Sequence, residues 1–197
     1  MQKPSRIAIF ASGNGSNAEA IVGYFKDHDS IQVSLILTNN PQAFVLQRAE
    51  RLGIRSISFN REQFVKGEVI LSALKSYQIT HIVLAGFLWL IPAYLLKAFP
   101  NRIINIHPAL LPKYGGKGMY GLKVHEAVKI AGDKQTGITI HLVNENYDEG
   151  KILFQGSCEI ASHYSPQEIA ECVHKLEYEN YPRVIEGWIQ NDDQPIS

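Results

Sequence analysis

Short apolar runs alternate along this chain with longer stretches in which apolar residues recur at helical spacing. Such runs are typical of buried strands, and such stretches of amphipathic helices. The runs predict strands over residues 6–11, 33–39, 54–59, 81–87, 102–107, 137–143 and 152–160. The periodic stretches predict helices over residues 17–28, 42–53, 61–78, 91–99, 124–132 and 165–190, with Pro182 expected to kink the last one.

This alternation predicts an α/β fold with a mostly parallel sheet and helices on both faces. The weaker strand at 54–59 is expected at a sheet edge. In the last two predicted strands apolar and polar residues alternate, which predicts a half-buried, partly antiparallel C-terminal extension. We expect residues 1–190 to form a single domain and residues 191–197 to form a flexible tail.

The charge composition disfavours nucleic acids and acidic membranes as binding partners. Nineteen basic and nineteen acidic side chains cancel, whereas broad binding to nucleic acid or to an acidic membrane needs a basic excess. No apolar stretch approaches the ~20 residues that span a membrane. The only two cysteines, Cys158 and Cys172, lack the spacing of metal ligands, so we expect reduced thiols in a cytoplasmic protein.

Three segments with polar or glycine-rich character follow predicted strands. They are "GNGSN" (13–17), "GFLWLI" (86–91), and the pair Asn105 and His107 that ends the fifth strand. Ligands of parallel sheets bind beyond the carboxyl ends of the strands. We therefore expect the three segments to gather on one rim.

The first segment is suited to an anion. A helix start with exposed N–H groups and a positive dipole end binds phosphate without a lysine, and Ser16 or Asn17 is expected to cap the helix. The stretch is neither G-x-G-x-x-G nor a Walker loop, which disfavours a dinucleotide or a nucleoside triphosphate. A plain glycine-rich turn before a capped helix is the alternative.

Asn105 and His107 stand two residues apart, so in a strand they face the same side while Ile104 and Ile106 face away. An amide can donate a hydrogen bond to a developing oxyanion, and an imidazole can exchange a proton near neutral pH. A purely structural histidine is the alternative. No serine or cysteine stands beside them as a nucleophile, which favours direct transfer between two bound substrates.

The turn "NENYDEGKI" (144–152) carries Glu145, Asp148 and Glu149. A carboxylate beside His107 would raise the pKa of its imidazole and orient the ring. Asp148, next to the Gly150 turn, is the best candidate; a solvated acidic turn is the alternative. His141 could also lie near this group, although a satisfied core histidine is the more common outcome for that position.

Motifs over nearly the whole chain resemble the glycinamide ribonucleotide branch of the formyltransferase family. The matching segments are "FASGNGSNAEAI", "VLAGF", "INIHPALLPKY", "GITIHLV" and "DEGKIL", in this order. The Asn-x-His-Pro motif followed by Leu-Leu-Pro is specific for the wider family, and Gly-Asn-Gly-Ser-Asn for this branch. The resemblance implies a Rossmann-like formyltransferase fold and a folate-dependent enzyme.

Residue by residue, the resemblance assigns catalytic roles to Asn105, His107 and Asp148. It implies that the ribonucleotide is held by Gly15, Ser16, Asn17, Ala18, Glu19, His174 and Glu177. It implies that the folate is held by Arg61, Leu88, Trp89, Leu90, Ile91, Asn105, Asn144, Tyr147 and Asp148.

The implied reaction transfers a formyl group from the co-substrate 10-formyltetrahydrofolate to the amine of glycinamide ribonucleotide, a step of purine synthesis. Asn105 would hydrogen-bond the oxyanion, protonated His107 would stabilise it, and Asp148 would raise the pKa of His107 and help move the proton. The resemblance implies small-molecule substrates, no metal, no nucleic-acid or membrane partner, and a monomer or homodimer.

Two relatives share the chemistry. Methionyl-tRNA formyltransferases carry an extra C-terminal domain and a basic surface, and formyltetrahydrofolate deformylases carry an added N-terminal domain, so both are less favoured here. A nucleotide-binding module without activity would not need the three catalytic residues together.

Three features depart from the family pattern: Ala109 in place of serine, Trp89 in place of a polar residue, and a longer segment over residues 114–124.

Overall fold

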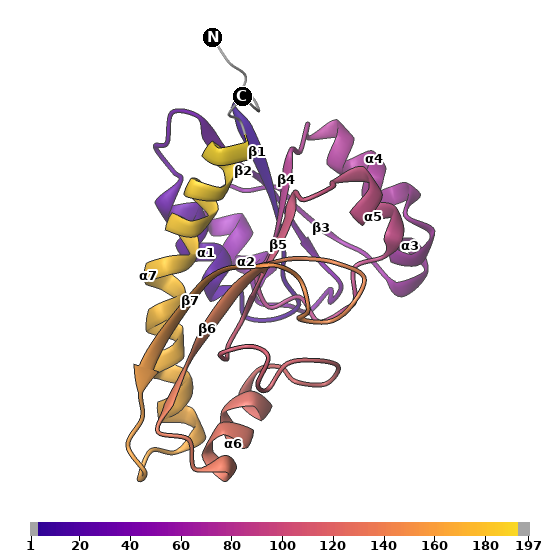
Figure 1. The fold of residues 1–197 in the computed structure, drawn as a ribbon. Coiled ribbons are helices and arrows are strands. Elements are labelled where there is room, and N and C mark those ends of the chain that lie inside the picture. Colours follow the sequence, from indigo (N-terminus) through magenta and orange to yellow (C-terminus); the bar gives the residue numbers. More distant parts are fainter. Residues whose placement is uncertain (1–3, 193–197) are drawn as a thin grey trace.

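The computed structural model describes residues 4–192, built around one seven-stranded sheet (Figure 1). The strands are β1 (Ser5–Phe10), β2 (Ile31–Thr38), β3 (Ser56–Ser58), β4 (His81–Leu84), β5 (Ile103–His107), β6 (Gln135–Leu142) and β7 (Ile152–Glu159). The helices are α1 (Ser16–Tyr24), α2 (Val45–Arg51), α3 (Arg61–Lys66), α4 (Glu68–Ser76), α5 (Ala93–Ala98), α6 (Leu122–Ala131) and α7 (Pro166–Asp192).

The strand order is β3-β2-β1-β4-β5-β6-β7. Strands β3, β2, β1, β4 and β5 are parallel neighbours, whereas β6 pairs antiparallel with both β5 and β7. This topology confirms the predicted mostly parallel sheet, the edge position of the third strand and the antiparallel C-terminal extension. Buried apolar residues dominate β1, β2, β4 and β5, as strands covered on both faces require.

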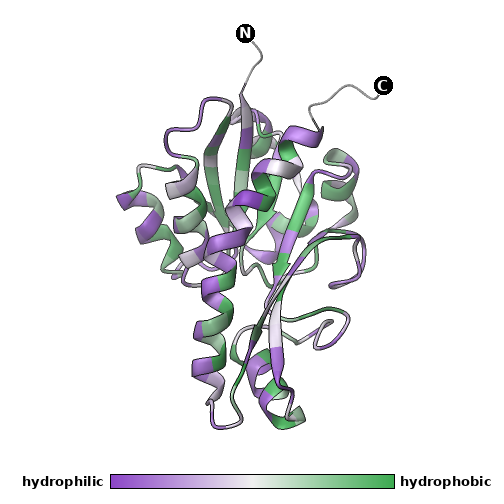
Figure 2. Cartoon of the chain, turned by 60° about the vertical axis from the view of Figure 1, so that its left-hand side comes forward, coloured by the Kyte–Doolittle hydropathy of each residue, from purple (hydrophilic) through white to green (hydrophobic). Residues whose placement is uncertain are grey.

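Helices cover both faces of the sheet, as predicted. One apolar cluster joins alternate residues of β1 and β5, such as Ile7 and Ile104, to α1, α2 and α7. The other joins the intervening residues, such as Ala8 and Ile103, to α3, α4 and α5. Figure 1 shows α7 on one side of the sheet and α3, α4 and α5 on the other, and Figure 2 shows apolar residues concentrated along the strands.

The predicted helix over residues 61–78 is two helices. The chain breaks at Gly67, whose φ of 81° belongs to the left-handed region that glycine adopts freely. A Cβ at that position would lie 2.7 Å from the ring of Tyr94, so the break also lets α5 approach closely. The first predicted helix is shorter than expected and ends at Tyr24, and the fourth strand ends at Leu84 rather than at residue 87.

The last helix runs as one element through Pro182 to Asp192. Two residues of the predicted tail therefore belong to α7, and residues 193–197 lie outside the described part of the chain. Within residues 4–192, no helix is both long enough and apolar enough to cross a membrane. Cys158 and Cys172 are both free.

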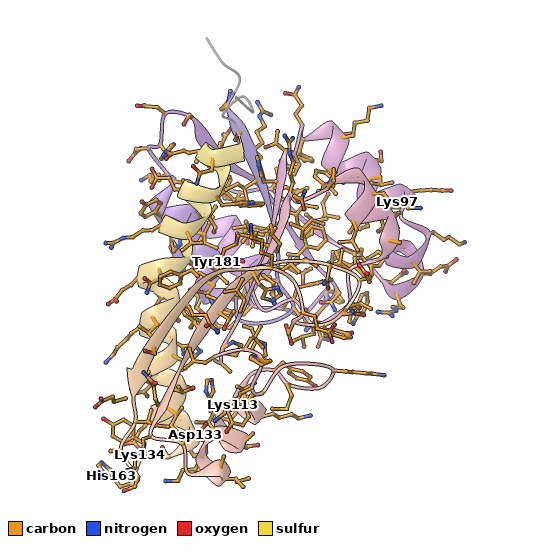
Figure 3. All side chains as sticks on the ribbon, in the orientation of Figure 1. Lys97, Lys113, Asp133, Lys134, His163 and Tyr181 are labelled. Atoms are coloured by element: carbon orange, nitrogen blue, oxygen red, sulfur yellow. The ribbon has the colours of Figure 1, made fainter. Side chains whose placement is uncertain are left out.

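Tyr181, labelled in Figure 3, holds α7 against strands β4 and β5. Its side chain is fully buried, and its hydroxyl donates a hydrogen bond to the Leu84 carbonyl oxygen at 2.9 Å, with the Ile104 carbonyl oxygen at 3.5 Å. Residues four apart share a helix face. Tyr181 therefore also fixes the turn of α7 that presents Glu177 to the ends of the strands.

We expect Tyr181→Phe to lower the free energy of unfolding by about 0.5–1.5 kcal/mol, since the buried hydrogen bond is lost while the ring stays packed. Urea unfolding followed by circular dichroism measures this. Tyr178→Phe is the matched control, because Tyr178 is on the same helix but 39% exposed, and should stay within about 0.5 kcal/mol of the wild type. Equal effects of the two substitutions would contradict the role assigned to the Tyr181 hydroxyl.

Candidate active site

The carboxyl ends of β1, β4 and β5 open onto a cavity of about 730 Å³. Its walls include residues 12–17 after β1, 85–88 after β4, 105–108 at the end of β5, and 116–122 before α6. His125 of α6, Tyr147 and Asp148 of the β6–β7 turn, and Ala170, His174 and Glu177 of α7 complete the lining. The prediction that the three segments share one rim is confirmed.

The loop after β1 leaves the start of α1 open. Gly15 is the N-cap residue, with a φ of 77°, and no side chain caps the helix. The expectation that Ser16 or Asn17 caps it was wrong, because both residues lie inside the first turn. The first N–H groups of a helix have no intrahelical partner, so an uncapped helix start at a cavity wall can bind an anion.

Helix α2 supports this loop from behind. The Val45 N–H donates to the Gly13 carbonyl oxygen at 3.1 Å, and a Cβ at Gly15 would lie 2.4 Å from Val45 Cγ2. The Arg48 guanidinium donates to the backbone and side-chain oxygens of Asn14 at 2.9 and 2.8 Å. Arg48 is not among the residues predicted for this site, because it lies far from the loop along the chain.

Two residues assigned to the ribonucleotide do not reach the cavity. Ala18 is fully buried beneath the loop. The Glu19 carboxylate pairs with the guanidinium groups of Arg48 and Arg51. Glu19 therefore fixes Arg48 against the loop, and only Gly15, Ser16 and Asn17 of the predicted set line the cavity here.

The Asp148 carboxylate lies next to the other two predicted catalytic residues. Its Oδ2 accepts a hydrogen bond from the Gly116 N–H at 2.9 Å and lies 3.5 Å from His107 Nδ1. Its Oδ1 lies 3.5 Å from Asn105 Nδ2 and 3.7 Å from His141 Nε2. The predicted grouping of Asn105, His107 and Asp148 therefore exists in the fold.

The turn that carries Asp148 is tightly constrained. Asp148 itself has a φ of 58°, an uncommon conformation for a residue with a side chain. Two residues later, a Cβ on Gly150 would lie 1.6 Å from the Leu142 carbonyl oxygen and 3.3 Å from His141 Nδ1. The turn therefore lies directly against the end of β6.

His141 belongs to the same cluster and is also a satisfied core residue. Its Nδ1 lies 2.8 Å from the Leu142 carbonyl oxygen, to which it must donate. In the neutral ring Nε2 is then an acceptor, and it takes a hydrogen bond from Asn105 Nδ2 at 3.1 Å. His141 thereby determines which way the Asn105 amide points.

The pKa of His107 is lowered in the folded protein. Burial is the largest influence and lowers it, while Asp148 and the Tyr114 carbonyl oxygen, 2.8 Å from Nε2, raise it. The predicted upward effect of Asp148 on this pKa is present, but burial outweighs it, so the net pKa of His107 lies below its ordinary value. The free protein therefore favours a neutral His107 with acceptors near both ring nitrogens.

Asp148 stays ionised beside this ring. Burial raises the pKa of the carboxyl group, but His141, His107 and the Gly116 N–H together hold it below its ordinary value. The Gly116 N–H donates to the carboxylate directly, and either imidazole stabilises its negative charge whenever that ring is protonated. The cluster thus holds an anion next to a neutral base.

On the far wall, α7 contributes a second buried acid. Glu177 is only 6% exposed, and its carboxylate accepts a hydrogen bond from Asn17 Nδ2 at 2.8 Å. Burial raises the pKa of Glu177, and the Asn17 amide and His174 offset part of the rise. The two predicted α7 residues, His174 and Glu177, therefore do lie opposite the loop after β1.

The residues assigned to the folate divide into two groups. Leu88, Asn105, Tyr147 and Asp148 line the cavity, whereas Arg61, Trp89, Leu90, Ile91 and Asn144 do not. The Arg61 guanidinium lies over the Trp89 ring at 4.7 Å, and that ring packs against an aromatic cluster. The Leu90 N–H donates to the Tyr147 hydroxyl at 3.1 Å.

Two further parts of the wall, residues 116–122 and His125, are also not among the predicted site residues. A usable signal was the density of glycines, because Gly116, Gly118 and Gly121 all have positive φ values. Among residues 4–192, no group of three or more histidine, cysteine, aspartate or glutamate side chains is arranged to hold a metal ion.

Comparisons with known proteins agree with this geometry. The sequence model of the family described as "Formyl transferase" matches residues 5–185. A protein of Bacillus subtilis named phosphoribosylglycinamide formyltransferase is 39% identical over 185 residues, which are 91% of this chain and 92% of that protein. A chloroplastic protein of the same name from Arabidopsis thaliana is 39% identical over 91% of this chain, which spans 64% of the plant protein's length.

Solved structures give the same result. The crystal structure of phosphoribosylglycinamide formyltransferase from Bacillus halodurans superposes with a TM-score of 0.85 at 33% identity, covering 96% of this chain and 97% of that one. The enzyme of that name from Anaplasma phagocytophilum gives a TM-score of 0.85 at 30% identity, covering 93% and 86% of the two chains. The family match over residues 5–185 spans all seven strands and the segments that follow β1, β4 and β5.

We expect Asp148→Asn to lower the pKa of His107 further, because the nearby anion that favours imidazolium is removed. An NMR titration of the His107 ring in the wild type and the variant measures this. Glu145→Gln is the control, since Glu145 is exposed on the same turn and should leave the titration unchanged. An unchanged His107 titration in Asp148→Asn would mean that the carboxylate does not act on the ring.

Proposed function

Because the chain belongs to the formyl transferase family, we propose that it transfers a formyl group from 10-formyltetrahydrofolate to the amine of glycinamide ribonucleotide. The product is formylglycinamide ribonucleotide, an intermediate of purine synthesis. The observation that carries this proposal is the meeting of Asn105, His107 and Asp148 in one cavity with an uncapped helix start.

In this proposal the ribonucleotide phosphate lies at the loop after β1. Gly15, Ser16 and Asn17 offer backbone N–H groups at the positive end of α1, and Arg48 keeps Asn14 in place behind them. The ribose lies against Glu177 and His174, where the Glu177 carboxyl oxygens accept hydrogen bonds from its hydroxyls. The amine then extends toward the end of β5.

The chemical step forms one C–N bond and breaks another. The amine nitrogen attacks the formyl carbon, and the formyl oxygen becomes an oxyanion in the tetrahedral intermediate. Collapse of this intermediate restores the carbonyl and breaks the bond to the folate nitrogen. One proton leaves the amine, and one proton ends on the folate nitrogen, so that no external acid, base or metal is consumed.

Asn105 stabilises the oxyanion. One of its two amide N–H groups is held by His141 Nε2 at 3.1 Å. The other faces Asp148 Oδ1 at 3.5 Å, which is the limit of a hydrogen bond. This second N–H is weakly committed in the free protein and can turn to the formyl oxygen as its charge develops.

The His107–Asp148 pair carries the proton. Burial keeps His107 neutral in the free protein, so that the ring can take up a proton as the amine attacks. The Asp148 carboxylate and the Tyr114 carbonyl oxygen then stabilise the imidazolium until the proton passes to the folate nitrogen. The pair, rather than either residue alone, titrates during the reaction.

The folate pterin is proposed to lie by Leu88 and Tyr147, with its formyl group at Asn105 and Asp148. Five residues that the resemblance assigns to the folate do not line the cavity, and we propose that they support the residues that do. They are Arg61, Trp89, Leu90, Ile91 and Asn144. A metal-free reaction, a monomer or homodimer, and a cytoplasmic location remain predictions of the resemblance and the composition.

One assay tests the proposed function directly. Purified protein is mixed with 10-formyltetrahydrofolate, with and without glycinamide ribonucleotide, and the folate absorbance is followed. Loss of the formyl-folate only in the presence of the amine supports the transferase. Equal loss without the amine would replace it by a hydrolase, and no loss in either case would overturn the proposal.

We expect Asn105→Ala to lower kcat by about 10²–10³-fold, the usual effect of removing one oxyanion donor. The KM for the ribonucleotide should change much less, because the phosphate and ribose contacts lie elsewhere. Steady-state kinetics measure both quantities, and circular dichroism confirms that the variant is folded. A folded Asn105→Ala enzyme with a near wild-type kcat would remove Asn105 from the chemistry.

We expect Gly15→Ala to raise the KM for the ribonucleotide at least tenfold. Its φ of 77° disfavours alanine, and the added Cβ would lie 3.0 Å from the Val45 Cα, so that the loop must move. Gly23→Ala in α1 is the control, since its Cβ would meet nothing within 4 Å. If Gly15→Ala instead raised only the KM for the folate, the two substrates would be placed the wrong way round.

A further inference from the structure

His125 is a buried histidine in the cavity wall to which the reaction described above gives no role. It lies in the first turns of α6, is 2% exposed and lines the cavity together with His107, His174 and Glu177. Neither the strand-end motifs nor the resemblance drew attention to it. Its side chain is nevertheless as deeply enclosed as those of the proposed catalytic residues.

One nitrogen of this ring lacks the hydrogen bond that a buried polar atom normally has. The His125 Nδ1 atom is buried and has no partner among the described residues. An unsatisfied buried donor or acceptor costs about 1–3 kcal/mol, so such groups are rare and call for an explanation. Because His125 lines the cavity, a ligand there would remove this cost if the ring turned its Nδ1 edge toward it.

The other buried histidines of the described chain differ from His125. His141 has contacts at both ring nitrogens, His107 reaches the Tyr114 carbonyl oxygen, and His81 Nδ1 lies 2.9 Å from the Thr80 hydroxyl. A histidine with a purely structural role is expected to be satisfied in the same way. The orphaned nitrogen of His125 therefore favours a role in binding.

The charge state of the ring limits which ligand group it can meet. Burial lowers the pKa of His125 to about 4, with further lowering by His174 and His107. At neutral pH the ring is uncharged and offers one N–H donor and one acceptor nitrogen. Such a ring suits an uncharged group that both donates and accepts, and a phosphate is better served by the loop after β1.

The two histidines that act on His125 indicate which part of the substrate it meets. His107 marks the end of the cavity where the amine reacts, and His174 marks the end where the ribose is proposed to lie. In glycinamide ribonucleotide, the carboxamide connects the ribose to the carbon that bears the amine. A carboxamide presents one N–H donor and one carbonyl acceptor, and either of them can pair with one nitrogen of a neutral imidazole.

We propose that His125 hydrogen-bonds the carboxamide of the ribonucleotide and so determines the specificity of the site for an amide-linked amine. The inference rests on the proposed function and extends it to a residue outside the three catalytic ones. His125 binds and positions the substrate, and takes no proton in the reaction.

His125→Phe is the sharpest test, because it keeps a buried ring and removes both nitrogens. We expect the Kd of the ribonucleotide, measured by calorimetry, to rise at least tenfold, while the KM for the folate stays within about twofold. The melting temperature should stay the same or rise, because an unsatisfied polar group is removed. A purely structural histidine would give an unchanged Kd, and that result would overturn the proposal.

Two further variants make the test specific. His125→Gln restores a donor and an acceptor, so it should recover part of the lost affinity and keeps the proposal falsifiable if the phenylalanine variant does not fold. His163→Phe is the matched control, since His163 is exposed and lies at the lower end of the molecule in Figure 3, on the segment that leads into α7. It should bind the ribonucleotide as the wild type does.

Ribose 5-phosphate separates the carboxamide from the ribose as the partner of His125, because it lacks the amide. His125→Phe should bind ribose 5-phosphate as tightly as the wild type does; an equal loss for both ligands would overturn the carboxamide assignment. These binding measurements need no turnover. Wild-type protein that binds the ribonucleotide but fails the formyl-transfer assay would contradict the proposed function and leave the His125 result intact.

Discussion

The site depends on keeping one carboxylate ionised in a buried position. Asp148 is held by the Gly116 N–H and faces the side chains of Asn105, His107 and His141. These groups come from the end of β5, the end of β6 and the loop before α6, so three separate parts of the chain must meet for the charge to be tolerated. Because a buried charge without such partners is costly, the same contacts that prepare the chemistry also fix the register of the strand ends.

Much of this arrangement could be predicted from the sequence, because it follows from chain order. Parallel strands deliver their carboxyl ends to one rim, and a two-residue spacing puts Asn105 and His107 on one face. The sequence indicates that an acidic residue of the 144–152 turn pairs with His107, but it identifies Asp148 only as the best candidate among three. The structure adds the reason, since that turn lies against β6 and reaches the same face as the end of β5.

What the sequence could not predict depends on burial and on contacts between distant residues. The net pKa of His107 is lowered because enclosure outweighs its anionic partner, and enclosure is not visible in a local motif. Arg48 of α2 contacts Asn14 in the loop before α1, and no sequence motif links the two residues. The break at Gly67 lies in a stretch with good helical periodicity and depends on the approach of Tyr94. In each case the deciding partner is far away along the chain.

Gly150 shows how closely this chemistry limits evolutionary change. Any side chain there would bring a Cβ to 1.6 Å from the Leu142 carbonyl oxygen, against the strand that carries His141. Glycine is the only amino acid without a Cβ, so every amino-acid change reached from its codon by a point mutation meets the same backbone oxygen. No single substitution at this position is therefore conservative. The acidic turn either keeps its glycine or changes together with the end of β6.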